Sequence, residues 1–258
     1  MLQLITNVAL KRATDAGRGN VQDFLERLLI EVVSENYRYF ANEHVGLQKS
    51  YERAELHCLP PLLANERQVS GLFATGLSRV CPVSRPEHPI TRPAKEDDVD
   101  GATGAGGNGR VDFLALFGER HIALELKRIP ISTTGEPKRK RVVLQARWES
   151  VTGQAKSALA HMRATPDQYR SPVSVGLLVV RVHRSIGARG ELEDSPRAAS
   201  TLMADLVDRV RIDTKADFLC HYCPPPEMQV SFGWGKGKKH FRWFPGVIFA
   251  GVVHDHAR

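Results

Sequence analysis

Two adjacent segments have the pattern of a β-hairpin that could hold a metal-binding site. Residues 110–117 (RVDFLALF) and 120–127 (RHIALELK) carry apolar side chains at every second position, as paired strands with one buried face do. Gly118 suits the first position of a tight turn between them, because glycine readily adopts a positive φ angle. With a two-residue turn, Phe117 lies opposite Arg120, which fixes the pairing of the two strands.

This register places two carboxylates side by side. Asp112 lies opposite Glu125, five residues along each strand from that first pair, and directly opposed side chains are about 5 Å apart at Cβ. Facing carboxylates repel each other unless a cation lies between them, and such oxygen ligands suit Mg²⁺ or Mn²⁺. Lys127 follows on the same face, so its ammonium group can reach the same volume. The other face is expected to lie in the core and carries Val111, Phe113, Ala115, Phe117, Ile122, Leu124 and Leu126.

Two predicted helices each carry a polar residue within an apolar stripe. Glu66 lies between Leu62 and Val69, where a carboxylate is unfavourable unless it is paired or bound to a metal. Gln154 shares a helical face with Val151 and other apolar residues. Each could mark the border of its apolar face by chance. Together with the hairpin, we expect both to contribute to one polar site.

In this order, the residues resemble the PD-(D/E)XK nuclease superfamily. A helix with a glutamate precedes a hairpin that reads Asp112-x12-Glu125-Leu-Lys127, and a helix with a glutamine follows. Restriction endonucleases, junction resolvases and RecB-like exonucleases belong to this superfamily. The resemblance covers residues 62–182 and depends on order, alternation and register.

The resemblance implies an α/β fold in which helices flank a restriction-endonuclease-like mixed β-sheet. Residues 1–60 would form an N-terminal helical addition, and residues 61–258 the nuclease-like domain. Val111 stands where many members have proline, at a position expected to point to the core. Ala158 stands where RecB-like members have a tyrosine after the glutamine, which argues against a RecB-like exonuclease.

The resemblance also implies a mechanism. Asp112, Glu125, the Leu126 carbonyl and, from its helix, Glu66 would bind one or two Mg²⁺ or Mn²⁺ ions. Lys127 would orient or deprotonate the attacking water and stabilise the transition state. The implied activity is hydrolysis of phosphodiester bonds, most directly by a DNA endonuclease in defence against foreign DNA, as a homodimer or in a larger complex. The alternative is a catalytically silent nucleic-acid-binding or scaffolding module on the same fold, although such a module has no physical reason to keep facing carboxylates.

Positive charge is concentrated in two segments of a chain whose net charge is +7. Residues 127–147 hold seven basic residues and one acidic residue, and residues 231–245 hold four basic residues and no acidic one. Such patches indicate a polyanionic partner, with solvated loops as the alternative. Residues 234–243 also interleave aromatic residues, which suits either stacking on bases or core anchors of a β-hairpin. The candidate nucleic-acid contacts are Lys138, Arg139, Lys140, Arg141, Trp234, Lys236, Lys238, Lys239, Arg242 and Trp243.

The composition argues against several other classes of protein. Hydrophobic residues make up 42% and charged residues 25%, as in an ordinary globular protein. The apolar runs are too short to span a membrane, and the N-terminus lacks the pattern of a secretory signal. Cys220 and Cys223 have no second pair at zinc-finger spacing, and the glycines of residues 104–109 precede a predicted strand instead of a helix. We therefore expect a cytoplasmic protein without membrane contact.

Overall fold

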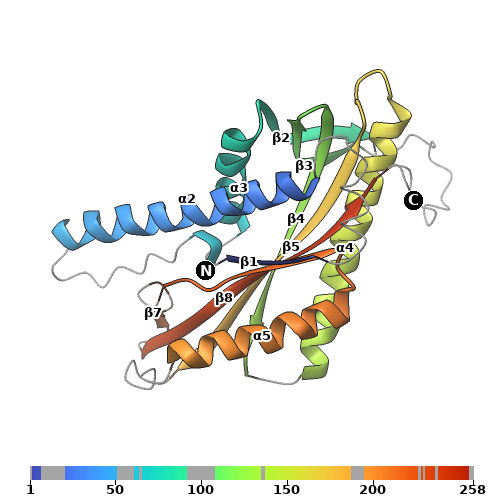
Figure 1. Ribbon diagram of the computed structural model, residues 1–258. Coiled ribbons are helices and arrows are strands. Elements are labelled where there is room, and N and C mark those ends of the chain that lie inside the picture. The colour runs from blue at the N-terminus through green and yellow to red at the C-terminus, as the bar shows by residue number, and fades with distance from the viewer. Residues whose placement is uncertain are drawn as a thin grey trace.

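The computed structural model describes residues 2–6, 21–50, 61–63, 66–91, 108–134, 137–186, 195–225, 228, 230–235 and 238–255. Within these ranges the chain forms one large β-sheet between two layers of helices (Figure 1). The helices are α2 (Val21–Ser50), the short 3₁₀ helix η1 (Pro61–Leu63), α3 (Glu66–Val80), α4 (Pro137–Ala164) and α5 (Ser195–Thr214). The strands are β1 (Leu2–Thr6), β2 (Val83–Thr91), β3 (Asn108–Phe117), β4 (Arg120–Ser132), β5 (Val173–Ile186), β6 (Phe218–Tyr222), β7 (Val230–Gly235) and β8 (Lys238–His254).

The sheet is mixed, as the sequence predicts for an α/β protein. The strand order is β1-β6-β8-β5-β4-β3-β2, and β7 pairs with β8 outside this path. Strands β4 and β5 are parallel because α4 connects them, and the other neighbouring pairs are antiparallel. No helix in the described part of the chain is long and apolar enough to cross a membrane.

The two faces of the sheet bury different helices. Helices α2 and α3 pack on one face and form the main core with β3, β4, β5 and β8, whereas α4 and α5 cover the other face. The N-terminal segment that was predicted to be helical also contains a strand, and its helix is part of the main core. Residues 2–6 form a strand that pairs with β6, and α2 places its apolar stripe in the main core. The expected boundary near residue 60 lies outside the described residues. The buried α2 residues are Val21, Phe24, Leu25, Leu28, Leu29 and Val32.

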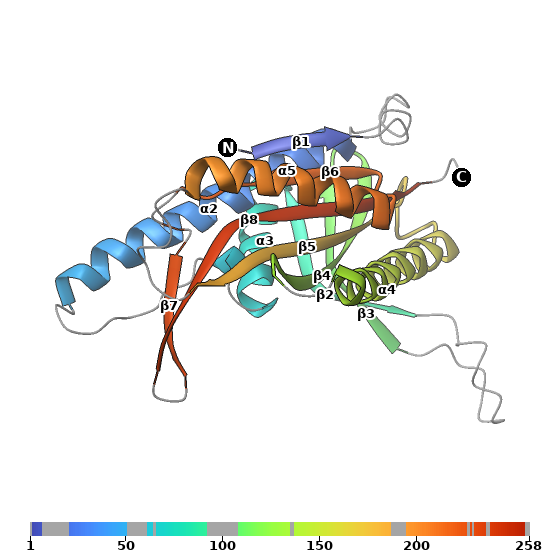
Figure 2. The same ribbon diagram turned by 90° about the horizontal axis from the view of Figure 1, so that it is seen from below.

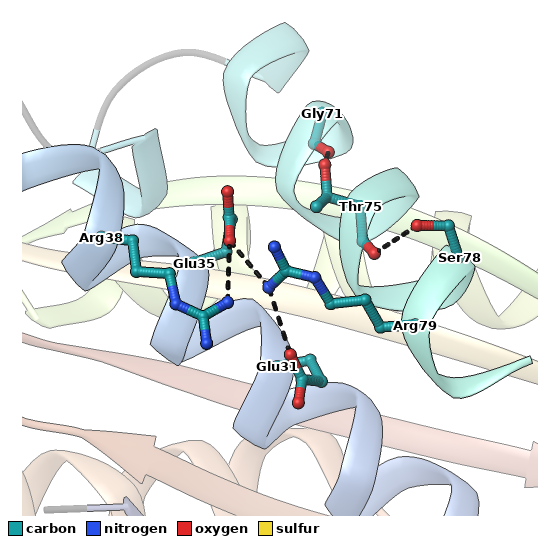
Figure 3. Close-up of polar contacts among 7 residues, drawn as sticks. All are labelled: Glu31, Glu35, Arg38, Gly71, Thr75, Ser78 and Arg79. Carbon is teal, nitrogen blue, oxygen red and sulfur yellow. Dashed lines mark hydrogen bonds and ion pairs between the residues drawn. The ribbon is translucent and has the colours of Figure 1, made fainter. Parts of the chain in front are cut away.

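Polar contacts fix α3 against α2 on the solvent side of this layer. Arg79 of α3 donates to Glu31 at 3.2 Å and lies 2.8 Å from Glu35, both on α2 (Figure 3). Gly76 lets the helices approach closely, because a Cβ there would lie 3.2 Å from the Leu28 side chain. Since α3 begins at Glu66, this packing also determines where the N-terminus of α3 lies.

Strand β8 extends beyond the body of the sheet. Its first residues pair with β7 to form a hairpin that projects away from the helices (Figure 2). Farther along, β8 enters the sheet between β5 and β6. The hairpin therefore links the basic, aromatic residues 234–243 to the core.

Candidate active site

The predicted register of the central hairpin is confirmed. Phe117 pairs with Arg120, and the ladder continues to Phe113, which pairs with Leu124. Gly118 has a φ angle of 59°, in the region that favours glycine, as the predicted turn requires. Phe113 and Leu124 are both buried in the main core, as the alternation predicts. The predicted pairing of Asp112 with Glu125, the next in line, is not a pair of this ladder.

At Asp112 the strands cease to pair regularly. The β3–β4 ladder ends at Phe113, and the β2–β3 ladder passes from Phe113 to Val111 without a pair at Asp112. Its neighbour on β2, Glu87, has a φ angle of 48°, which shows a local distortion of the backbone. The Asp112 carboxylate instead accepts a hydrogen bond of 2.7 Å from the backbone N–H of Leu126. This contact holds the Asp112 side chain beside the backbone that immediately follows Glu125.

The same distortion overturns the prediction for Val111. By strict alternation, Val111 would share the core face of Phe113. Instead it packs on the α4 side of the sheet, in the cluster that contains Leu114 and Ala123. Period-two alternation holds only while a strand stays regular, and the irregular step at Asp112 interrupts it.

Glu125 and Lys127 lie on the sheet face that α4 covers. Glu125 is only 1% exposed and is paired in the β4–β5 ladder with Gly176. A Cβ at Gly176 would lie 3.0 Å from the Val151 carbonyl and 3.3 Å from the Ala155 Cβ. Glycine therefore allows α4 to approach the sheet closely beside Glu125. Lys127 is two residues farther along β4 and is half-buried.

Helix α4 also brings Gln154 to this region. Gln154 follows Val151 by one helical turn, and Val151 contacts the Gly176 position beside Glu125. The side chain is half-buried, and its Oε1 atom is buried without a hydrogen-bond partner among the described residues. An unsatisfied buried acceptor is unfavourable, so this amide is suited to accept a hydrogen bond from a ligand.

The oxygen donors at this point of the sheet fit a hard divalent cation. Asp112 and Glu125 supply carboxylates, and the Leu126 carbonyl is adjacent, which is the ligand type that Mg²⁺ and Mn²⁺ prefer. The predicted third carboxylate, Glu66, is the first residue of α3, but its side chain lies outside the described residues. Among the side chains that the structure describes, no group of three His, Cys, Asp or Glu residues is arranged to hold a metal ion.

Most of the first basic segment, residues 127–147, belongs to a strand and a helix and not to a solvated loop. Strand β4 extends to Ser132, and residues 138–141 lie in the first turns of α4. Arg141 forms an ion pair with Asp213 of α5, with Nε and Oδ1 3.0 Å apart. Arg139 and Lys140 line a cavity of about 310 Å³ beside the end of β4. These two cations therefore border an open hollow, whereas Arg141 already has an acidic partner.

The second basic segment lies in a β-hairpin, which is one of the two alternatives that its sequence left open. Backbone pairing runs from Val230 opposite Trp243 to Gly235 opposite Lys238. Trp243 is 4% exposed, which favours the interpretation of a core anchor for this residue, and Arg242 beside it is exposed. The side chains that lie outside the described residues are those of Lys138, Trp234, Lys236, Lys238 and Lys239.

One group of polar residues was not singled out from the sequence. By strand alternation, Arg128, Arg181, His183 and Arg242 lie on the α2–α3 side of the sheet, and the three arginines add to burial in lowering the pKa of His183. The available signal was the run VVRVHRSI at 179–186, in which charged residues interrupt a buried apolar strand at alternate positions.

Comparison with known proteins found no match. No family model, no curated protein and no solved structure matches the chain. The interpretation of the site therefore depends on its residues and geometry.

Proposed function

We propose that the protein is a metal-dependent nuclease that hydrolyses phosphodiester bonds. The observation that carries this proposal is the hydrogen bond from the Leu126 N–H to the Asp112 carboxylate, at the point where the β3–β4 ladder ends. It holds an aspartate beside the backbone of β4, where the adjoining residues are a buried glutamate and a lysine two positions later.

Each residue has a role in this proposal. Asp112, Glu125 and the Leu126 carbonyl would hold Mg²⁺ or Mn²⁺. Glu66, predicted as a further ligand, begins α3, which packs on the other face of the sheet from Glu125. The bound ion would supply neutralisation of the phosphate charge and a lowered pKa of the attacking water. Lys127 would orient that water and stabilise the charge that develops on the phosphate. Gln154 would accept a hydrogen bond from substrate or water through its Oε1 atom.

The substrate follows from the charge distribution. The Arg139–Lys140 hollow lies farther along β4 than Lys127, and the net charge of +7 favours a polyanion. DNA is the first substrate to test, in plasmid, linear and single-stranded forms. An endonuclease that acts in defence against foreign DNA, as a homodimer or in a larger complex, is the fuller form of the proposal.

The test measures the rate of DNA cleavage in Mg²⁺, Mn²⁺ or chelator, and it compares variants of the site with control variants. Asp112→Asn, Glu125→Gln and Lys127→Met should each lower the cleavage rate by about a hundredfold or more. Asp112→Asn keeps an oxygen that can accept the Leu126 N–H, so its melting temperature should stay near that of the wild type. The controls are Glu119→Gln, in the exposed turn of the same hairpin, and Lys156→Met, on the exposed side of α4.

Two results would count against the proposal. Full activity of Glu125→Gln, or cleavage in chelator, would exclude this site as the catalytic centre. Nucleic-acid binding by pure, folded protein without cleavage of any substrate form would favour the catalytically silent binding or scaffolding module.

A further inference from the structure

Three arginines and a histidine on the α2–α3 side of the sheet form a group that we call the arginine cluster: Arg128, Arg181, His183 and Arg242. They come from β4, β5 and β8. Arg128 and Arg181 lie on the adjacent strands β4 and β5, and both Arg128 and Arg242 are near enough to Arg181 to lower its pKa by charge repulsion, after the larger effect of burial. Arg128 follows Lys127 directly in β4, so alternation places the cluster on the opposite face of the sheet from Glu125 and Lys127.

Arg181 is held in place at the centre of the cluster. Its guanidinium lies over the ring of Phe244, 5.4 Å from the ring centroid, and one Nη donates to the Leu63 carbonyl of η1. Its Nε is buried and has no hydrogen-bond partner among the described residues. Burial, followed by repulsion from the two other arginines, lowers the pKa of Arg181 to about 10. No acidic residue of the described part of the chain forms an ion pair with it.

His183 shows how strongly positive this volume is. Its ring lies 6.4 Å from that of Phe244, and burial together with Arg181, Arg242 and Arg128 lowers its pKa to about 4. The imidazole is therefore neutral at pH 7, among three guanidinium groups. Bringing like charges together in a partly buried volume is unfavourable unless an anion offsets them.

We propose that the arginine cluster is a binding site for a phosphate group, in a nucleic-acid backbone or as free phosphate. Guanidinium groups match the geometry of phosphate oxygens and keep their charge. A fixed guanidinium whose Nε–H has no partner among the described residues is suited to donate to such an anion. Arg242 also lies at the base of the β7–β8 hairpin, whose sequence continues with three lysines within residues 236–239. A polyanion held at the cluster could thus extend along the hairpin. This site requires neither a metal nor cleavage, so it goes beyond the proposed nuclease function.

The test measures binding in chelator, first at constant ionic strength and then, for DNA, over a range of salt concentrations. The first arm follows the melting temperature with inorganic phosphate, against chloride at equal ionic strength. The second follows fluorescence anisotropy of labelled single-stranded and duplex DNA. The variants are Arg181→Met and Arg242→Gln. The control is Arg211→Gln, which removes an exposed arginine of α5 on the other sheet face. Asp112→Asn is included because it disables the proposed nuclease centre without touching the cluster.

The expected result is that each cluster variant weakens binding of one or both probes about tenfold, as loss of a charge-assisted hydrogen bond implies. The control should stay within about twofold of the wild type. Asp112→Asn should bind at least as tightly as the wild type, because it removes a negative charge and leaves the cluster intact. If DNA alone is affected, with a shallower dependence of affinity on salt, the anion is a backbone phosphate. If inorganic phosphate is affected and DNA is not, the site takes a free phosphate group.

Two results would overturn the proposal. The first is a wild type that binds neither probe in chelator. The second is wild-type affinity for both probes in the cluster variants. Because Arg242 is exposed, Arg242→Gln should fold normally, and it decides the question even if Arg181→Met does not fold. Loss of cleavage by Asp112→Asn with intact binding would separate the two proposals.

Discussion

His183 should make the protein sensitive to mild acid, and this sensitivity tests the electrostatics of the arginine cluster. In the folded protein its pKa is lowered to about 4 by burial and by Arg181, Arg242 and Arg128, against a weaker, opposing hydrogen bond with the Ile131 backbone. In the unfolded chain its pKa is about 6.5. Between these values the unfolded state binds a proton that the folded state does not. The part of the folding free energy that depends on neutral His183 is therefore fully present above pH 6.5 and is lost as the pH falls towards 4.

The magnitude follows from the two pKa values. At pH 5, the imidazole is almost fully protonated in the unfolded chain and about one-tenth protonated in the folded protein. This difference lowers the free energy of unfolding by roughly 2 kcal/mol relative to pH 8. Because the side chain is only half-buried, solvent screening reduces the expected effect to about 1–2 kcal/mol. For a chain of this size, that corresponds to about 2–8 °C in melting temperature.

The assay compares melting temperatures at pH 8 and pH 5 for the wild type, His183→Asn and Arg181→Met. His183→Asn should lose less stability on acidification, by the amount given above, because it has no proton to bind. Arg181→Met should also lose less stability on acidification than the wild type, but the difference should be smaller than for His183→Asn, because only one of the charges that lower the pKa of His183 is removed. An acid-induced loss in His183→Asn equal to that of the wild type would refute the reasoning.

Three other predictions concern packing, an ion pair and thiol reactivity. Gly176→Val should lower stability by about 1–3 kcal/mol, because its side chain would meet the Val151 carbonyl, 3.0 Å from the Cβ position; an unchanged melting temperature would contradict this close approach of α4. Asp255→Ala should lower the free energy of unfolding by about 3 kcal/mol, because it leaves the buried Arg120 without its partner at 2.9 Å. Denaturant unfolding measures this loss, and an unchanged free energy of unfolding would contradict it. Cys220, whose pKa burial raises to about 12, should stay unmodified by iodoacetamide at neutral pH in native protein, and peptide mapping that finds it labelled would contradict its burial.

The central hairpin was predictable from the sequence because its signals are local. Alternation and a glycine at the turn determine the register, and the pairing of Phe117 with Arg120 and of Phe113 with Leu124 follows from them. The burial of Glu125 depends on contacts that are distant in the sequence. It requires α4 to lie on the sheet where Gly176, on another strand, leaves space. No pattern within residues 110–127 contains that information.

Helix boundaries were harder to predict for a different reason. The charge of residues 138–141 leaves a solvated loop open as an alternative, yet lysine and arginine are good helix formers and Pro137 suits the first position of a helix. Strand β1 is an edge strand whose partner, β6, lies more than two hundred residues later. Its five residues carry too little pattern to predict that pairing.

The arginine cluster could not be predicted from a local pattern because its members come from three strands that are distant in the sequence. In β4, Lys127 and Arg128 are consecutive and therefore point to opposite faces of the sheet. The sequence joins them into one basic segment with residues 138–141, whereas the fold assigns Lys127 to the carboxylate site and Arg128 to the arginine cluster. A basic segment in a strand thus divides its charge between two surfaces, and its net charge does not say which surface binds.

This division restricts how a single nucleic acid could occupy both proposed sites. The carboxylates and the arginine cluster lie on opposite faces of the sheet, and β4 contributes to both. Beyond Leu124, the described ladder pairs β4 with β5 alone, since β3 has already diverged at Phe113. A chain that reached both faces would have to pass this edge of β4, next to Asp112, which is where the proposed cleavage occurs. A phosphate held at the cluster would then keep the strand fixed beside the carboxylates, so loss of Arg181 should raise the substrate concentration needed for cleavage more than it lowers the maximal rate.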